Sequence, residues 1–131
     1  TPITPNGPAV RLCASSQLSV PDGTTVAGSF NKLGNRRFLR FSLPAARTLR
    51  IRASCPISDP ACGGDPRPDP DFVLSRAADV TVAEDGTSTV EDLDVPATAG
   101  DYVLEVYEYS HIDPTAASRR GRTCITVTIT G

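Results

Sequence analysis

The chain has 131 residues, of which 39% are hydrophobic, 21% charged and 5% aromatic, which suits one domain with a modest core. Its 13 basic and 15 acidic residues give a net charge of −2, so it lacks the basic excess with which proteins neutralise a nucleic-acid backbone. No apolar run approaches the roughly 18 residues of a membrane helix, and we therefore expect no membrane span.

The first nine residues form a leader rich in Pro and Gly. They read TPITPNGPA, a composition typical of the end of an interdomain linker. Because the sequence begins at Thr1 and contains no Met, we expect that a signal peptide or a flanking domain was removed. We therefore predict a linker or N-terminal leader over residues 1–9 and a single domain over residues 10–131.

Beyond the leader, apolar and polar residues alternate in one short segment after another. Segments 36–43 and 47–54 are joined by residues 44–46, a connection short enough for a hairpin. A second turn-rich hairpin is expected around residues 84–86. The positions expected to face the core are Val10, Leu12, Ala14, Leu39, Phe41, Leu43, Leu49, Ile51, Ala53, Tyr102, Leu104, Val106, Ile125, Val127 and Ile129. About eight such segments and no amphipathic helix predict an all-β, antiparallel β-sandwich.

Four cysteines occur, at Cys13, Cys55, Cys62 and Cys124. Cys55 and Cys62 bracket a short loop, whereas Cys13 and Cys124 lie in the first and last apolar segments, out of phase with the core positions. This spacing favours the pairs Cys55–Cys62 and Cys13–Cys124 among three connectivities. A zinc site is disfavoured because no Cys-x-x-Cys pair is present and the single His is distant. Two disulfides indicate a secreted, periplasmic or extracellular protein.

The order of these segments resembles a known family. Residues 38–54, then 69–76, then a turn-rich hairpin, then 99–110 with Ala-Gly-x-Tyr before an aromatic strand, and finally 123–131 resemble the bacterial pre-peptidase C-terminal domain. This family is a jelly-roll-like β-sandwich found beside the catalytic domains of secreted proteases and other exported hydrolases, and the collagen-binding domains of bacterial collagenases are similar to it. The resemblance, over about residues 23–131, implies a non-catalytic accessory module.

Three features depart from the family pattern. Ala46 stands where the family usually has Gly after Leu-Pro-Ala, and the Cys-bracketed segment 55–62 is not a general family feature. Relatives that bind calcium use acidic residues in the N-terminal linker, whereas residues 1–21 contain no acid. A calcium site of that linker type is therefore not expected.

The last aromatic segment supplies the candidate ligand-binding residues. If its core face is buried, Glu105, Tyr107 and Tyr109 lie on the opposite, exposed face. Exposed aromatic side chains with a polar tip make good binding anchors. By resemblance, Tyr107 and Tyr109 match the tyrosines with which collagen-binding relatives help hold the triple helix. The alternative is that one or both tyrosines pack under the loop 111–122.

Acidic residues gather in segment 59–71, among prolines that leave backbone carbonyls free of strand pairing. Calcium takes six to eight oxygen ligands, so Asp69 and Asp71 are candidate calcium ligands. Alternatively, Asp71 only accepts backbone N–H bonds at the start of a strand. We expect no obligatory cofactor, with calcium as the candidate ion.

Two further sets of residues have a functional and a structural interpretation. Arg40, Arg50 and Arg52 would share the solvent face of adjacent strands. In the functional interpretation they bind an anionic polymer, and in the structural one they only keep the sheet soluble and discourage pairing with other strands. His111, beside Ser110, is either an exposed loop imidazole or a catalytic base. The exposed-loop interpretation is favoured because sequence neighbours rarely form a triad.

We therefore predict a monomeric, extracellular, non-catalytic binding module rather than an enzyme. It would tether or orient an associated hydrolase, most simply a protease, on a polymer or protein surface. One alternative is a secreted protein-binding or protease-inhibitor domain that uses the disulfide-bracketed loop 55–70 as a rigid probe. A third hypothesis is a small hydrolase centred on His111.

Overall fold

The computed structural model describes residues 1–14, 36–63, 67–76, 79–84, 89–112 and 122–131, and within residues 79–84 only the backbone. The strands of this part of the chain are β1 (Val10–Ala14), β2 (Arg37–Leu43), β3 (Arg47–Ser54), β4 (Pro70–Arg76), β5 (Asp79–Glu84), β6 (Val90–Ala97), β7 (Gly100–Glu108) and β8 (Thr123–Thr130). Two short helical turns accompany them, the 3₁₀ turn η1 (Pro60–Cys62) and α1 (Tyr109–Ile112). No helix among the described residues is long and apolar enough to cross a membrane.

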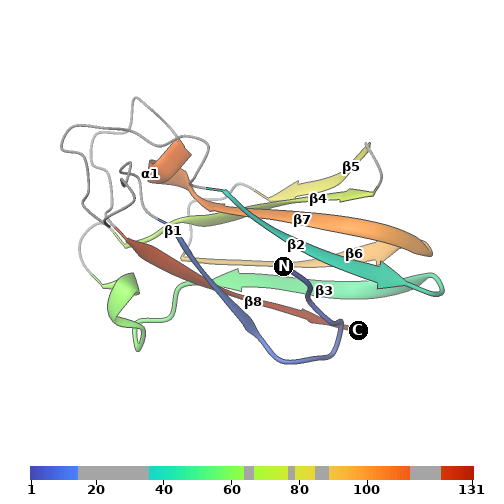
Figure 1. The fold of residues 1–131 in the computed structure, drawn as a ribbon, viewed down its shortest axis with the longest axis horizontal. Helices are drawn as coiled ribbons and strands as arrows, with labels where there is room; N and C mark the ends of the chain where they lie inside the picture. The colour runs from blue at the N-terminus through green and yellow to red at the C-terminus, as the bar shows by residue number, and fades with distance from the viewer. Residues whose placement is uncertain (15–35, 64–66, 77–78, 85–88, 113–121) are drawn as a thin grey trace.

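The strands form two four-stranded sheets packed face to face, in the orders β1-β8-β3-β6 and β2-β7-β4-β5 (Figure 1). Each strand of the first half pairs antiparallel with its counterpart counted from the end: β1 with β8, β2 with β7, β3 with β6 and β4 with β5. This is the pairing of a jelly roll, in which one long double strand folds over into a sandwich. The predicted all-β, jelly-roll-like sandwich is confirmed.

Two predicted local pairings are wrong. We expected segments 36–43 and 47–54 to form a hairpin, but β2 and β3 lie in different sheets. The hairpin expected around residues 84–86 fails in the same way, because β5 pairs with β4 and β6 pairs with β3. Alternation decides which face of a strand is buried, and two strands in opposite sheets bury their apolar faces in the same core without being neighbours. Residues 23–30, whose alternation in the sequence also predicts a strand, lie outside the described residues.

The core lies between the two sheets. The inward residues predicted from alternation in β2, β3, β7 and β8 are all buried, namely Leu39, Phe41, Leu43, Leu49, Ile51, Ala53, Tyr102, Leu104, Val106, Ile125, Val127 and Ile129. Phe41 and Tyr102 stack across the β2–β7 pair with ring centroids 5.2 Å apart. In β1, at the edge of its sheet, Val10 and Leu12 are only partly buried and pack against this core.

The leader packs on the sandwich. Ile3 is buried in the core, and its N–H donates to the carbonyl of Arg40 at 2.9 Å. The turn at residues 4–7 places Asn6 at φ 61°, where its side-chain amide both donates to and accepts from the backbone of Gly131, at 2.7 and 2.9 Å. Gly131 has φ 128°, and a Cβ there would lie 2.2 Å from the carbonyl oxygen of Thr48. Residues at the two ends of the chain are thus held together, and the division at residue 9 stays a prediction.

Candidate functional site

The outer surface of the sheet β2-β7-β4-β5 carries an apolar patch on its β2 and β7 strands. Because Leu39 and Leu104 point into the core, their neighbours along each strand point outward. Phe38 on β2 is 51% exposed and Val103 on β7 is 37% exposed. We call the outward residues Phe38, Arg40, Val103, Glu105 and Tyr107 the β2–β7 face.

Cross-strand register orders this face. Phe38 lies opposite Glu105, and Arg40 lies opposite Val103 on the neighbouring strand. Arg40 is exposed and makes no ion pair within the part of the chain that the structure describes. Its guanidinium is therefore available to an anionic group from outside.

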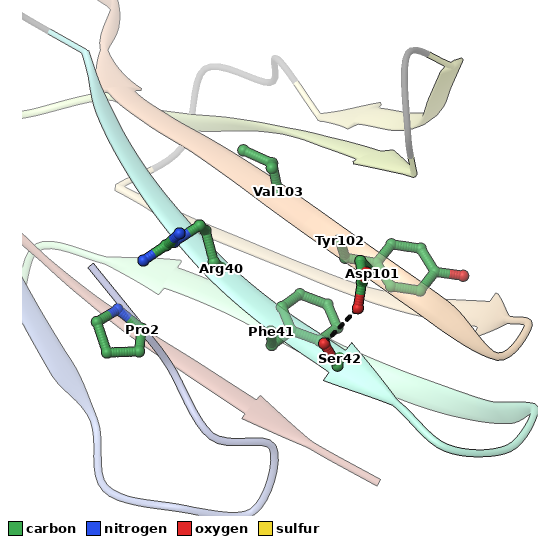
Figure 2. Close-up of a pocket in the computed structure, with 7 residues that line it drawn as sticks. All are labelled: Pro2, Arg40, Phe41, Ser42, Asp101, Tyr102 and Val103. Atoms are coloured by element: carbon green, nitrogen blue, oxygen red, sulfur yellow. Dashed lines mark hydrogen bonds between the residues drawn. The ribbon is translucent and has the colours of Figure 1, made fainter.

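A shallow pocket of about 440 Å³ opens beside Arg40 (Figure 2). The residues that line it are Pro2, Arg40, Phe41, Ser42, Asp101, Tyr102 and Val103. Asp101 is held by Ser42, whose hydroxyl donates to the carboxylate at 2.5 Å. The pocket therefore offers an unpaired cation next to an apolar surface.

Glu105 and Tyr107 are both engaged by Arg36. The guanidinium of Arg36 forms an ion pair with Glu105 and lies over the ring of Tyr107, 5.3 Å from its centroid. Both side chains are half-buried. At this end of the β2–β7 face, the guanidinium of Arg36 is thus already paired with a carboxylate and an aromatic ring, whereas the guanidinium of Arg40 is unpaired among the described residues.

Tyr109 lies just beyond β7, as the first residue of α1, and is 47% exposed. Its backbone N–H donates to the carbonyl of Asp69 at 2.9 Å, which extends the antiparallel register of β4 with β7 by one pair. The alternation of burial also continues, since Tyr107 is half-buried, Glu108 is buried and Tyr109 is exposed. Tyr109 is therefore exposed as expected, although it lies outside β7.

The three predicted surface arginines do not share one face. Arg40 lies on β2, whereas Arg50 and Arg52 lie on β3 in the opposite sheet. Arg50 makes a two-pronged ion pair with Asp92 at 2.7 and 2.8 Å, and this contact lowers the pKa of the Asp92 carboxyl. The expected basic row is therefore wrong, because β2 and β3 are not neighbours.

A buried acidic cluster joins the start of β4 to β6 at one end of the sandwich. Asp69, Asp71 and Glu91 place carboxylate oxygens within 4.8 Å of one another, and Asp71 and Glu91 are buried. The structure thus brings the two predicted calcium-ligand candidates together and adds Glu91 from β6. Sequence reasoning missed Glu91, although it shares the alternation of Leu93 and Val95 and lies opposite the core residue Ala53.

Next to this cluster, Glu108 and His111 form a second buried polar group. Glu108 accepts from the backbone N–H of Asp69 at 3.1 Å and from the Ser110 hydroxyl at 2.5 Å. The Nε2 atom of His111 lies 3.9 Å from a Glu108 carboxylate oxygen. His111 is fully buried in α1, so the expected exposed loop imidazole is wrong.

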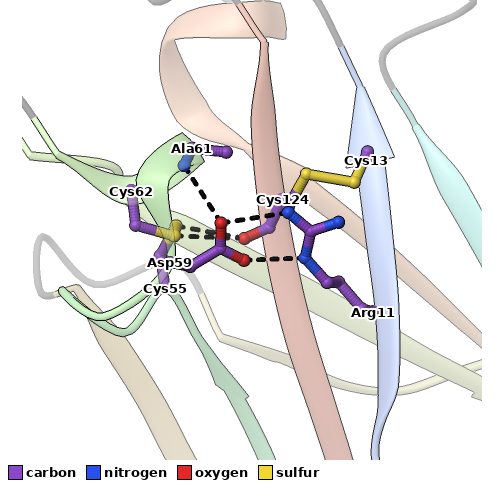
Figure 3. A network of polar contacts seen from close by, with 7 residues as sticks. All are labelled: Arg11, Cys13, Cys55, Asp59, Ala61, Cys62 and Cys124. Atoms are coloured by element: carbon purple, nitrogen blue, oxygen red, sulfur yellow. Dashed lines mark hydrogen bonds and ion pairs between the residues drawn. A yellow bond between two sulfur atoms is a disulfide. The ribbon is translucent and has the colours of Figure 1, made fainter.

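The loop 55–62 is fixed to the outside of the sheet β1-β8-β3-β6 (Figure 3). The disulfides Cys13–Cys124 and Cys55–Cys62 have the predicted pairing. The sulfurs of Cys55 and Cys62 lie 3.1 and 3.2 Å from the carbonyl oxygen of Cys124, as van der Waals contacts, because disulfide sulfurs carry no proton. Two disulfides favour an extracellular or periplasmic location.

An ion pair attaches this loop to β1. Arg11 contacts both carboxylate oxygens of Asp59, at 2.7 and 3.0 Å, and the same carboxylate accepts from the N–H of Ala61 at 3.0 Å. Together these contacts lower the pKa of Asp59 from its ordinary 3.8 to about 2, the Arg11 hydrogen bond contributing most. Asp59 thus caps η1 and joins it to the first strand.

Comparison with solved structures finds similar folds, among them those of the following two proteins. The pre-peptidase C-terminal domain of a collagenase from Bacillus anthracis has a TM-score of 0.55 and 12% identity, with 98% of this chain and 91% of that chain covered. A periplasmic inhibitor of g-type lysozyme from Aeromonas hydrophila has a TM-score of 0.48 and 15% identity, with 98% and 93% covered. No family model and no curated protein sequence matches the chain. The likeness to the collagenase domain confirms, at the level of the fold, the resemblance seen in the sequence.

The Arg11–Asp59 pair predicts a specific acid response. A carboxyl whose pKa is lowered by folding stabilises the folded state above its unfolded pKa, and this stabilisation is lost as the pH falls through the folded value. We expect Asp59→Asn to be less stable than the wild type at pH 5, with the difference shrinking from about pH 4 and mostly lost by pH 2. Urea unfolding followed by circular dichroism at each pH measures this. An equal difference in the free energy of unfolding at pH 5 and pH 2 would contradict the role assigned to the Arg11–Asp59 pair. The control is Asp94→Asn, which replaces an exposed acid on β6.

Proposed function

We propose that this protein is a non-catalytic, extracellular binding module that holds a secreted hydrolase on a protein or polymer surface through the β2–β7 face. The observation that carries the proposal is an exposed Phe38 and Val103 beside an unpaired Arg40 on a rigid, paired sheet. Aromatic residues and arginine are the side chains that most often dominate binding energy at interfaces.

The energetics of this face suit a modest, reversible attachment. Fully burying one large apolar side chain stabilises a complex by about 1.5–3 kcal/mol, and Phe38 and Val103 are already ordered by their strands. Arg40 adds recognition of a carboxylate or sulfate at the adjacent pocket. Because β2 and β7 are paired along seven residue pairs, binding there does not require reordering of the backbone.

The accessory role is supported by the likeness to a domain of a collagenase and by the disulfides, which fit an exported protein. The buried position of His111 supports a role without catalysis, since the hydrolase hypothesis depends on that imidazole. Tyr107 and Glu105, engaged by Arg36, would border the contact, and Tyr109 would contribute from α1.

Retention on insoluble polymers tests the proposal. The purified protein is incubated with collagen fibrils, chitin and peptidoglycan, and the bound fraction is measured after sedimentation. We expect retention on at least one of them, and a loss of about tenfold in affinity for Phe38→Ser, because one buried aromatic is worth at least 1.4 kcal/mol. Arg40→Ala should weaken binding in a salt-dependent way.

The matched control is Arg52→Ala, an exposed arginine on the opposite sheet, which should bind like the wild type. Retention on none of the polymers, or equal losses for the Phe38 and Arg52 variants, would refute a binding role for the β2–β7 face.

We also propose that Asp69, Asp71 and Glu91 hold a calcium ion. Three carboxylates within 4.8 Å repel one another when ionised, and a divalent cation converts that repulsion into attraction. Asp69 and Asp71 lie at the start of β4 and Glu91 lies on β6, so an ion would join the two sheets.

Calcium should therefore raise the thermal stability of the protein. At a concentration 100 times the dissociation constant the expected stabilisation is about 2.7 kcal/mol, measured by calorimetry with calcium and with EDTA. Asp71→Asn should abolish the difference between the two conditions, whereas Asp94→Asn should retain it. Identical melting of the wild type with calcium and with EDTA would refute the site.

A further inference from the structure

The disulfide-closed loop, residues 55–62, presents one aliphatic side chain to solvent. Ile57 is 76% exposed, more than any other large hydrophobic residue in the part of the chain that the structure describes. Its neighbours Pro56 and Ser58 are also exposed. A single exposed apolar residue is common on protein surfaces, so the exposure of Ile57 does not by itself indicate a binding site. The contacts that hold the loop provide the further evidence.

The loop is held from outside by two arginines. Arg67 donates to the backbone carbonyls at both ends of the loop, to Cys55 at 2.8 Å and to Cys62 at 3.3 Å. Arg11 holds the Asp59 carboxylate from β1. Together with the Cys55–Cys62 bond, these contacts fix an eight-residue segment whose only buried side chains are the two cysteines.

The loop is also ordered from within. The N–H of Asp59 donates to the carbonyl of Pro56 at 2.9 Å, and the N–H of Cys62 donates to the carbonyl of Asp59 at 2.9 Å. Ile57 and Ser58 are therefore the central residues of a closed turn. Ile57 adds little side-chain entropy loss on binding, because a β-branched side chain has few rotamers.

We propose that this loop is a second docking element, which inserts Ile57 into an apolar pocket on a folded protein partner. Much of the cost of ordering a binding loop is already met by the disulfide and the arginines, which is how a rigid loop gains affinity. A loop clamped at this many points, yet adding only its disulfide to the buried interior, is arranged for contact with another molecule.

The chemistry of the tip favours a protein over other partners. A lone branched aliphatic offers no aromatic ring to a sugar and no cation to a phosphate. One isoleucine beside Ser58 and Asp59 is also too small an apolar area for a stable hold on a membrane. A pocket on a protein, in contrast, can bury the whole isoleucine side chain, as happens in protein interfaces.

The turn also decides how the loop binds. A peptide bond in a protease cleft is held in an extended conformation, whereas residues 56–59 are closed by a backbone hydrogen bond. We therefore assign the loop to a pocket outside the catalytic cleft, not to substrate-like inhibition. Because the loop packs on β8, it lies on the sheet opposite the β2–β7 face, and both surfaces are open to partners at once.

Surface plasmon resonance with three secreted hydrolases, subtilisin, thermolysin and chymotrypsin, tests this inference. We expect at least one to bind without loss of peptidase activity, and Ile57→Ser to weaken that binding about tenfold. Ser58→Ala, its exposed neighbour, should bind within twofold of the wild type. Arg67→Ala, which keeps both disulfides, should lower the order parameter of the Ile57 amide from about 0.85 to below about 0.6 and weaken binding too.

Docking through Ile57 is distinct from the proposed binding through the β2–β7 face, and the two can be refuted separately. Ile57→Ser should leave retention on collagen, chitin and peptidoglycan unchanged, because the β2–β7 face is intact. Binding to none of the three hydrolases, equal binding of Ile57→Ser, or cleavage after Ile57 with inhibition would overturn it. So would Ile57-dependent binding to phosphatidylcholine–phosphatidylglycerol vesicles in place of the proteins.

Discussion

The structure depends on the pairing of its first strand with its last. Strands β1 and β8 pair over five residue pairs, with Cys13 directly opposite Cys124, and the disulfide joins residues 111 positions apart. This pairing is the outermost step of a nested series that ends at the β4–β5 hairpin. Without it, β8 would be held only by β3, and the core residues Ile125 and Val127 would lose their neighbouring strand on one side.

Closure of the sandwich in this way gives its two outer surfaces different properties. On one sheet, β8 is covered at Cys124 by the disulfide-closed loop, and Arg11 of β1 holds that loop in place. On the other sheet, β7 lies between β2 and β4 and leaves Val103 exposed next to Arg40. The disulfide-closed loop thus covers a central strand, β8, whereas the β2–β7 face spans the edge strand β2 and the central strand β7.

Alternation in the sequence predicted which side chains are buried, but it did not predict which strands pair. Leu49, Ile51 and Ala53 face the core as expected, because a period of two is a local property of one strand. Partner choice is a property of the whole chain, and the nested pairing places β2 beside β7 rather than beside β3. The expected arginine row failed for that reason alone.

Candidate site residues were predictable along β7 and for the residue that follows it. Glu105 and Tyr107 point outward and Tyr109 is exposed as expected, whereas His111, two residues further in α1, is buried. Glu91 was missed because no inward face was assigned to its segment, although its phase matches Val95. Buried polar residues at the end of the sandwich are set by contacts between segments distant in sequence, such as Asp69 with Glu108.

The free energy of unfolding of two double variants tests the role of this closure most directly. Loop-closure entropy gives about 4.8 kcal/mol for the bond that spans 111 positions and about 2.5 kcal/mol for the bond that spans seven. Cys13→Ala/Cys124→Ala should therefore lose clearly more stability in urea than Cys55→Ala/Cys62→Ala. Equal losses, or a greater loss for the second variant, would contradict the claim that the joined first and last strands hold the sandwich together.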